Sequence, residues 1–79
     1  MTLQEVTTLT RRIAADFFAH GMAAPMLAAP CDATGRFAAV YVAHADTGGL
    51  IMAVDSEATY CRVLVEMIVR DNWTAASLN

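Results

Sequence analysis

The stretch 55–72, DSEATYCRVLVEMIVRDN, limits the possible folds more than any other part of the chain. Asp55 and Ser56 can cap the free N–H groups of a starting helix, and Glu57 adds negative charge to its first turn. Wound as a helix, the stretch places Thr59, Arg62, Glu66 and Arg70 on one narrow polar stripe. Its apolar residues cover a sector about twice as wide as on an ordinary surface helix. We therefore expect this helix to be either the centre of the fold or half of an interface.

A second helix is predicted over residues 2–20. Thr2 and Glu5 form a capping-box pattern, in which each side chain satisfies the backbone N–H of the other residue. His20 suits a last helical turn, and Gly21 suits the position just past the end. Between these ends, apolar residues recur at three- and four-residue steps, as on one face of a helix: Leu3, Val6, Leu9, Ile13 and Phe17.

Three strands are predicted between the two helices. The segment 23–32 contains Pro25 and Pro30, which confine any strand there to the edge of a sheet. The segment 36–46 is rich in β-branched and aromatic residues and is apolar on both faces, as in a central strand covered on both sides. Leu50–Val54 is a short third strand. Turns are expected at 32–35 and 46–49, where aspartate and glycine occupy turn positions.

The order of these elements predicts a single α+β domain over residues 1–79. Its strands form a three-stranded antiparallel meander, and two helices pack on one face because the connections are short. The other face of the sheet is then open. It carries either Phe37 and Tyr41 or Val40 and Val42, and the apolar pattern of the central strand does not decide between the two.

Composition favours a globular chain with surplus apolar surface. Of its residues, 57% are apolar and 16% are charged, which excludes a disordered chain, and a domain of this size buries only about 60% of its surface. The net charge of −3 and the absence of lysine exclude a basic nucleic-acid-binding face. We expect a cytoplasmic protein that does not bind membranes, because no signal-peptide pattern begins the chain and its two cysteines are widely spaced.

Side chains that can bind a metal or transfer protons are expected to meet at one place in the predicted fold. The meander brings Asp16 and His20, at the end of the first helix, to the same end of the sheet as His44 and Asp46. Two imidazoles and two carboxylates can bind a metal or transfer protons, which would make the chain a small dimeric enzyme or a metal-dependent binder. The alternative is a solvated helix pair beside a strand end. No glycine-rich phosphate loop or close pair of metal ligands occurs, so we expect no cofactor and no catalytic residue.

The function that the sequence favours is protein binding. We expect a non-enzymatic interaction module, a small acidic inhibitor or adaptor that docks on or blocks a larger partner complex and forms a homodimer. This profile is similar to that of phage-borne inhibitors of bacterial defence systems (anti-CRISPR-like proteins), an analogy of class that no shared motif carries. The residues expected to contact the partner are Tyr41, Tyr60, Arg62, Glu66, Val69, Arg70 and Trp73.

Overall fold

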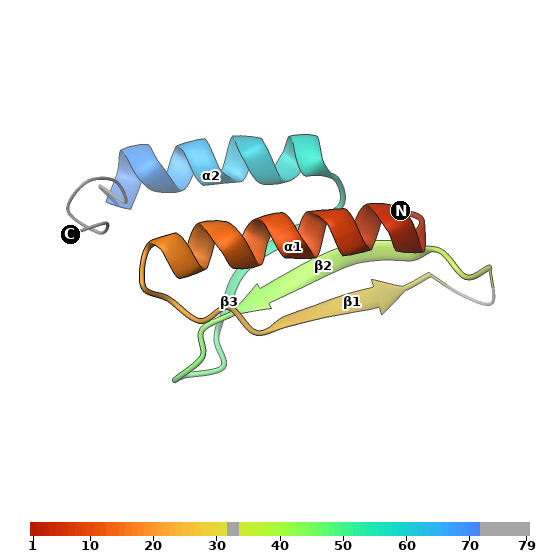
Figure 1. Ribbon diagram of the computed structural model, residues 1–79, viewed down its shortest axis with the longest axis horizontal. Coiled ribbons are helices and arrows are strands. Elements are labelled where there is room, and N and C mark those ends of the chain that lie inside the picture. The colour runs from red at the N-terminus through yellow and green to blue at the C-terminus, as the bar shows by residue number, and fades with distance from the viewer. Residues whose placement is uncertain (32–33, 72–79) are drawn as a thin grey trace.

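The computed structural model describes residues 1–31 and 34–71. Within them the chain forms helix α1 (Leu3–Ala19), strands β1 (Met26–Pro30), β2 (Phe37–Ala43) and β3 (Leu50–Val54), and helix α2 (Glu57–Asp71). The strands make an antiparallel sheet in the order β1-β2-β3, and both helices lie on one face of it (Figure 1). The predicted α+β fold is confirmed.

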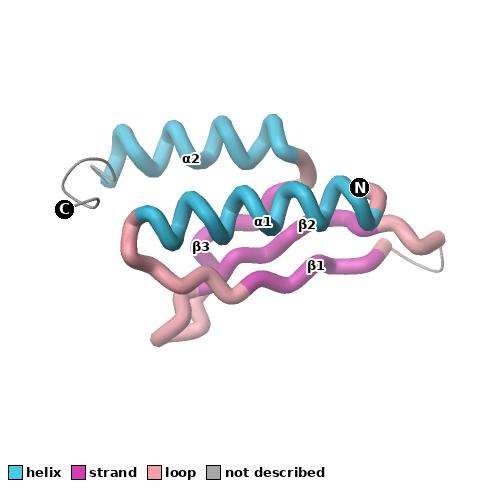
Figure 2. Tube along the Cα trace, in the orientation of Figure 1, coloured by secondary structure: helices cyan, strands magenta, loops and turns pink. Residues whose placement is uncertain are grey.

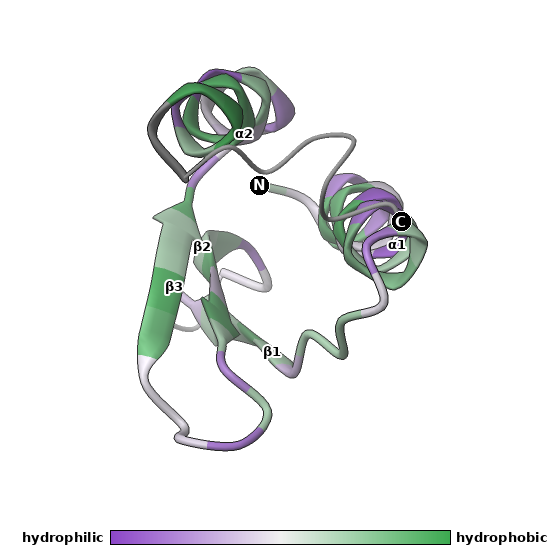
Figure 3. Ribbon diagram, turned by 90° about the vertical axis from the view of Figure 1, so that its left-hand side faces the viewer, coloured by the Kyte–Doolittle hydropathy of each residue, from purple (hydrophilic) through white to green (hydrophobic). Residues whose placement is uncertain are grey.

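The helices run in the same direction, because each of the five elements reverses the direction of the one before it (Figures 1 and 2). Helix α1 packs on β2, and α2 packs on β3. Viewed along the helices, α2 lies toward the β3 side of the sheet and α1 toward the β1 side (Figure 3). The opposite face of the sheet carries no helix of the described residues.

Helix α1 begins as the sequence predicts. The Thr2 hydroxyl accepts a hydrogen bond from the Glu5 N–H at 3.2 Å, and the Glu5 carboxylate accepts one from the Thr2 N–H at 3.0 Å. These bonds lower the pKa of Glu5, because they favour its ionised form. The helix ends at Ala19 with His20 as its C-cap, and Gly21 follows with a φ of 73°, which most other residues adopt only with strain. Leu3 is the one member of the predicted apolar stripe that lies outside the core, since its side chain is 65% exposed.

The core fills the space between the helices and the sheet. Val40 and Val42 of β2 are fully buried and point toward the helices, which leaves Tyr41 on the opposite face. The expectation that β2 is covered on both sides is therefore not met within the described chain. The buried residues come from every element except β1: Val6, Leu9, Ile13, Phe17, Val40, Val42, Met52, Val54, Tyr60 and Met67.

Phe37 lies on the core side, although strict alternation would place it with Tyr41. The pairing of β1 with β2 shifts by one residue, since Ala29 lies opposite Ala39 but Pro30 lies opposite Phe37. This bulge turns Phe37 inward, where it packs against the core. The backbone of Met1 fixes the same position, because the Phe37 N–H donates to the Met1 carbonyl at 2.8 Å. The sequence-based grouping of Phe37 with Tyr41 was therefore wrong.

Helix α2 begins at Glu57, directly after Asp55 and Ser56, the two residues predicted to cap it. The Ser56 hydroxyl accepts a hydrogen bond from the Thr59 N–H at 3.1 Å and so caps the first turn. The helix buries Tyr60 and Met67 but leaves Val65 and Val69 58% and 79% exposed. It lies at one side of the fold, which excludes the first of the two alternatives, a helix at the centre; the second, half of an interface, remains a prediction. Its predicted end at Asn72 falls outside the described residues.

Candidate interaction surface

The face of the sheet that the helices leave open is apolar and carries no charge. Strand register places Leu27, Tyr41 and Ala53 in one row across the three strands. Leu27 is 68% exposed, and Tyr41 is 40% exposed. We call this surface the outer face, and it consists of Leu27, Ala29, Ala39, Tyr41, Ala43, Leu50 and Ala53. The Tyr41 hydroxyl is its only polar side-chain group.

A shallow hollow of about 300 Å³ lies at the hairpin end of the outer face. Leu27 and Leu50, which are both more than half exposed, line it together with Tyr41. Its wall is completed by Pro25, from the connection between α1 and β1, and by Gly48, from the turn between β2 and β3. This shape accepts one apolar side chain and offers the Tyr41 hydroxyl as a hydrogen-bond partner.

Leu27 and Leu50 were missed by the sequence analysis, although they are the most exposed large apolar residues of the sheet. Tyr41 is the only member of the outer face among the residues expected to contact a partner. Cross-strand register is the signal that identifies the other two, because Leu27 lies opposite Tyr41 and Leu50 lies opposite Ala43. Register depends on pairing between segments that are distant in the sequence. Because each strand pair of this sheet contains a bulge, the register cannot be predicted from one strand alone.

Tyr60 is a core residue and is not available to a partner, contrary to the sequence-based expectation. Its side chain has no exposed surface, and its hydroxyl donates to the Asp16 carboxylate of α1 at 2.6 Å. Burial and the neighbouring Asp16 both raise the pKa of Tyr60, because they disfavour the phenolate. The Arg12 guanidinium carbon lies 5.6 Å from the Tyr60 ring centroid, and an Arg12 nitrogen donates to the Glu57 carboxylate at 2.6 Å. These residues join the two helices.

The outer surface of α2 carries three more of the residues expected to contact a partner, and that contact remains a prediction. Arg62, Glu66 and Val69 are exposed, and Val65 adds a second apolar side chain beside them. Neither Arg62 nor Glu66 makes an ion pair within the described part of the chain. The Arg70 side chain and the whole of Trp73 lie outside the described residues, so the predictions about them remain predictions.

The structure does not bring the two histidines and two carboxylates together as a metal site. Asp16 accepts the Tyr60 hydroxyl and lies 3.9 Å from an Arg12 nitrogen, so it faces α2. Asp46 accepts the N–H of Thr47 at 2.9 Å and shapes the hairpin turn. Across residues 1–31 and 34–71, no group of three or more His, Cys, Asp or Glu side chains has the arrangement to hold a metal ion. Cys31 and Cys61 are both free thiols.

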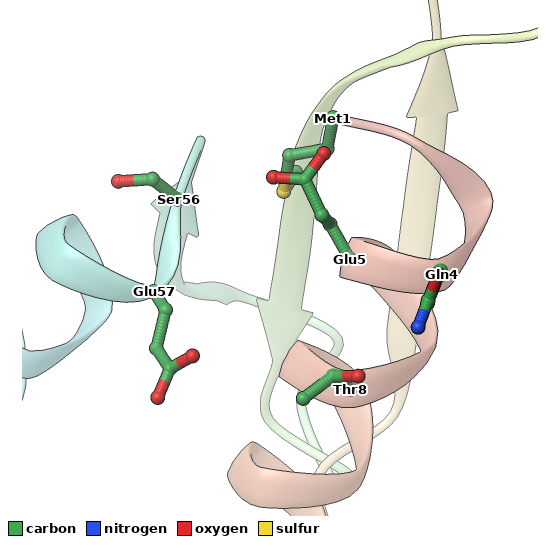
Figure 4. A pocket seen from close by; sticks show the side chains of 6 residues that line it. All are labelled: Met1, Gln4, Glu5, Thr8, Ser56 and Glu57. Carbon is green, nitrogen blue, oxygen red and sulfur yellow. The ribbon is translucent and has the colours of Figure 1, made fainter.

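A second hollow, of about 220 Å³, lies between the first turns of the two helices (Figure 4). Met1, Glu5 and Thr8 stand on the α1 side, and Ser56 and Glu57 stand on the α2 side (Figure 4). Both carboxylates already have partners, because Glu5 accepts from the Thr2 N–H and Glu57 accepts from Arg12. The first hydrogen bond caps the start of α1, and the second joins α1 to α2.

Within the described residues, no helix has both the length and the apolar character needed to cross a bilayer. Comparison of the chain with models of protein families, with curated proteins and with solved structures gave no match.

Proposed function

We propose that this chain is a non-enzymatic protein-interaction module, a small acidic inhibitor or adaptor that docks on a larger protein partner. The observation that supports this function is the outer face, on which Leu27, Tyr41 and Leu50 are exposed and no charge is present. In a sheet with one face in water, that face usually carries polar residues. A contiguous apolar patch on such a face therefore marks a site of protein binding.

The chemistry of the partner follows from the outer face and from the charge of the chain. An apolar anchor of the partner fills the hollow between Leu27, Tyr41 and Leu50, while the alanines around it allow close backbone approach. Tyr41 supplies a rigid aromatic side chain with a hydroxyl, the kind of residue that dominates binding energy in interfaces. The chain carries a net charge of −3, so a partner with a basic rim around its anchor is favoured.

The experiment compares two leucines with the same exposure on different surfaces. Leu27→Asp places a charge in the outer face, and Leu3→Asp places the same charge on the exposed start of α1, where the leucine is 65% rather than 68% exposed. Partners are captured from lysate of the native host with the unchanged chain, identified, purified and titrated against both variants. We expect Leu27→Asp to weaken binding at least about tenfold, because it leaves a charge unpaired in an apolar contact.

Leu3→Asp is the matched control and is expected to bind as the unchanged chain does, with circular dichroism confirming that both variants keep the fold. Equal affinities for all three proteins would refute the outer face as the docking surface. The alternative function, a small dimeric enzyme or metal-dependent binder, remains a prediction, and within the described residues no group of three or more His, Cys, Asp or Glu side chains could hold a metal ion for it.

A further inference from the structure

Strand β1 lies at one edge of the sheet, and no described segment pairs with its outer side (Figures 1 and 2). The direction of its backbone groups follows from one hydrogen bond, which the Ala43 N–H donates to the Pro25 carbonyl at 3.0 Å. The backbone of Pro25 therefore faces β2, and so does that of Leu27, because successive residues of a strand bond to opposite sides. The N–H and C=O groups of Met26 and Ala28 consequently point away from the sheet.

The two prolines near this strand leave these four backbone groups open. Pro25 lacks its N–H on the side of β2, so its ring does not obstruct the outer edge. The Cys31 N–H donates to the Arg36 carbonyl at 2.9 Å, so the residue before it, Pro30, faces outward. Proline cannot donate a ladder hydrogen bond, so the open edge ends at Pro30.

The β3 edge is shorter in regular geometry. The pairing of β3 with β2 skips Ile51, which leaves a bulge on this edge. Val42 faces β3 and lies opposite Met52, so Ala53 is the residue of β3 whose backbone groups point outward in regular geometry. A strand added at β3 would therefore gain half as many regular hydrogen bonds as one added at β1.

On the side that faces the helices, β1 is incompletely covered. Met26 and Ala28 pack against the core but are only half-buried. Helix α1 lies toward this side of the sheet (Figure 3), with Arg12 directed at α2, where it binds Glu57. Two residues before and after Arg12, Thr10 and Ala14 each lie about 160° round the helix from it, at about 100° per residue. The flank of α1 that faces away from α2 is therefore uncharged.

From these observations we propose that an extended segment of the partner adds to the sheet as a fourth strand beside β1. The segment runs antiparallel to β1, which is the more stable arrangement, and exchanges four hydrogen bonds with Met26 and Ala28. This inference rests on the proposed function, and it names the element of the partner that the chain recognises.

The surroundings of the added strand determine which side chains the segment carries. Its middle residue lies opposite Leu27, which is 68% exposed, and packs on that leucine at the border of the outer face. The residues before and after it lie opposite Met26 and Ala28, on the side of α1. Neither β1 nor the flank of Thr10 and Ala14 carries a charge, so three uncharged residues of apolar or β-branched type fit here.

Charge favours such a segment over a second copy of the chain. Each copy has a net charge of −3, so two copies repel each other on approach. A segment that carries lysine or arginine on both sides of its three uncharged residues is attracted instead.

Two proline substitutions test the β1 edge. Ala28→Pro removes an outward N–H that makes no bond to β2, so the sheet keeps its ladder and the added strand loses a donor. Ala53→Pro makes the same change at the β3 edge and is the matched control, with circular dichroism confirming that both variants keep the fold. For the partner identified under the proposed function, we expect Ala28→Pro to raise the dissociation constant about tenfold or more and Ala53→Pro to leave it unchanged.

A peptide probe tests the same edge without the partner and without a variant. The probe has about nine residues, alternating valine and threonine between two terminal lysines, and is titrated to about millimolar concentration. Its binding is followed by the NMR signals of the chain. We expect the largest shifts at the amide protons of Met26 and Ala28, which gain hydrogen bonds, and smaller shifts at Leu27, whose N–H already faces β2. The same peptide with methylated backbone nitrogens has no donors and is expected not to bind.

Several results would refute the added strand. A partner that binds Ala28→Pro and the unchanged chain equally, but loses affinity for Leu27→Asp, would refute it and leave the proposed function standing. Equal weakening by Ala28→Pro and Ala53→Pro, or equal binding of the methylated peptide, would also refute it. Shifts of the Met26 and Ala28 amides that depend on the concentration of the chain alone would assign the edge to a second copy. Peptide binding at this edge, with no partner on the outer face, would refute the proposed function and support the edge site.

Discussion

The hydroxyl of Tyr60 donates to the Asp16 carboxylate at 2.6 Å, while the Tyr60 ring is fully buried beneath the Arg12 guanidinium. A reading of α2 alone assigned this tyrosine to a partner, because an aromatic residue on a wide apolar helix suits an interface. Its true partner lies 44 residues away in the sequence, and only tertiary structure shows it. The same side chain thus satisfies one polar group at the junction of the helices and fills the core.

Tyr60→Phe removes this hydrogen bond and keeps the ring. We expect the free energy of unfolding to fall by about 1 kcal/mol, less than a fully buried bond to a charged group would contribute, because the Asp16 side chain is 35% exposed. Urea denaturation of the two proteins measures the difference. Tyr41→Phe is the matched control, since the Tyr41 hydroxyl lies on the open face, and it should leave stability unchanged.

The raised pKa of Tyr60 makes the stability of the fold depend on pH in one direction. Its pKa is raised in the folded state, so the neutral phenol stabilises the fold at every pH below the unfolded pKa of about 10. That stability is lost as the pH rises above this value. We expect the difference in near-ultraviolet absorbance between the unchanged chain and Tyr60→Phe to show Tyr60 ionising only together with unfolding. Ionisation of Tyr60 while the protein is still folded would contradict its buried position.

At the scale of the elements, the features that the sequence predicts correctly are those determined by residues close together in the chain. The capping box of α1 and the bounds of β3 were confirmed, because caps and short apolar runs between turns are local signals. The inward face of β2 was not predictable, since both of its faces are apolar. It is settled by which side chains pack on the helices, and Val40 and Val42 do so. Phe37 was misplaced because a bulge is a property of two paired strands.

Two residues of the α1 stripe show that helical spacing alone does not determine which apolar side chains are buried. Ile13 is fully buried and Leu3 is 65% exposed, although both fit the same helical spacing. Ile13→Ala is expected to lower the free energy of unfolding by about 2–5 kcal/mol, because it leaves a cavity between α1 and the sheet. Leu3→Ala should change it by no more than about 0.5 kcal/mol. Thermal unfolding followed by circular dichroism measures both, and comparable losses would contradict the observed burial.

At the scale of the molecule, an uncharged outer face is combined with a surplus of acidic groups. The net charge of −3 falls toward zero near the isoelectric point of about 5.0, where repulsion between copies vanishes. We expect turbidity to rise as the pH approaches this value and to fall again on either side. Leu27→Asp should reduce the turbidity more than Leu3→Asp does, because only the first variant places a charge on the outer face. Equal turbidity for the two variants would mean that association uses another surface.

The parallel course of α1 and α2 has a consequence for how this molecule can be linked to others. An odd number of strands separates the helices, so the chain enters α1 at one end of the sheet and leaves α2 at the other (Figure 1). Two proteins fused before Thr2 and after α2 would consequently be held apart along the length of the domain, as by a rigid spacer. Most small meanders with an even strand count would instead return both attachments to the same end.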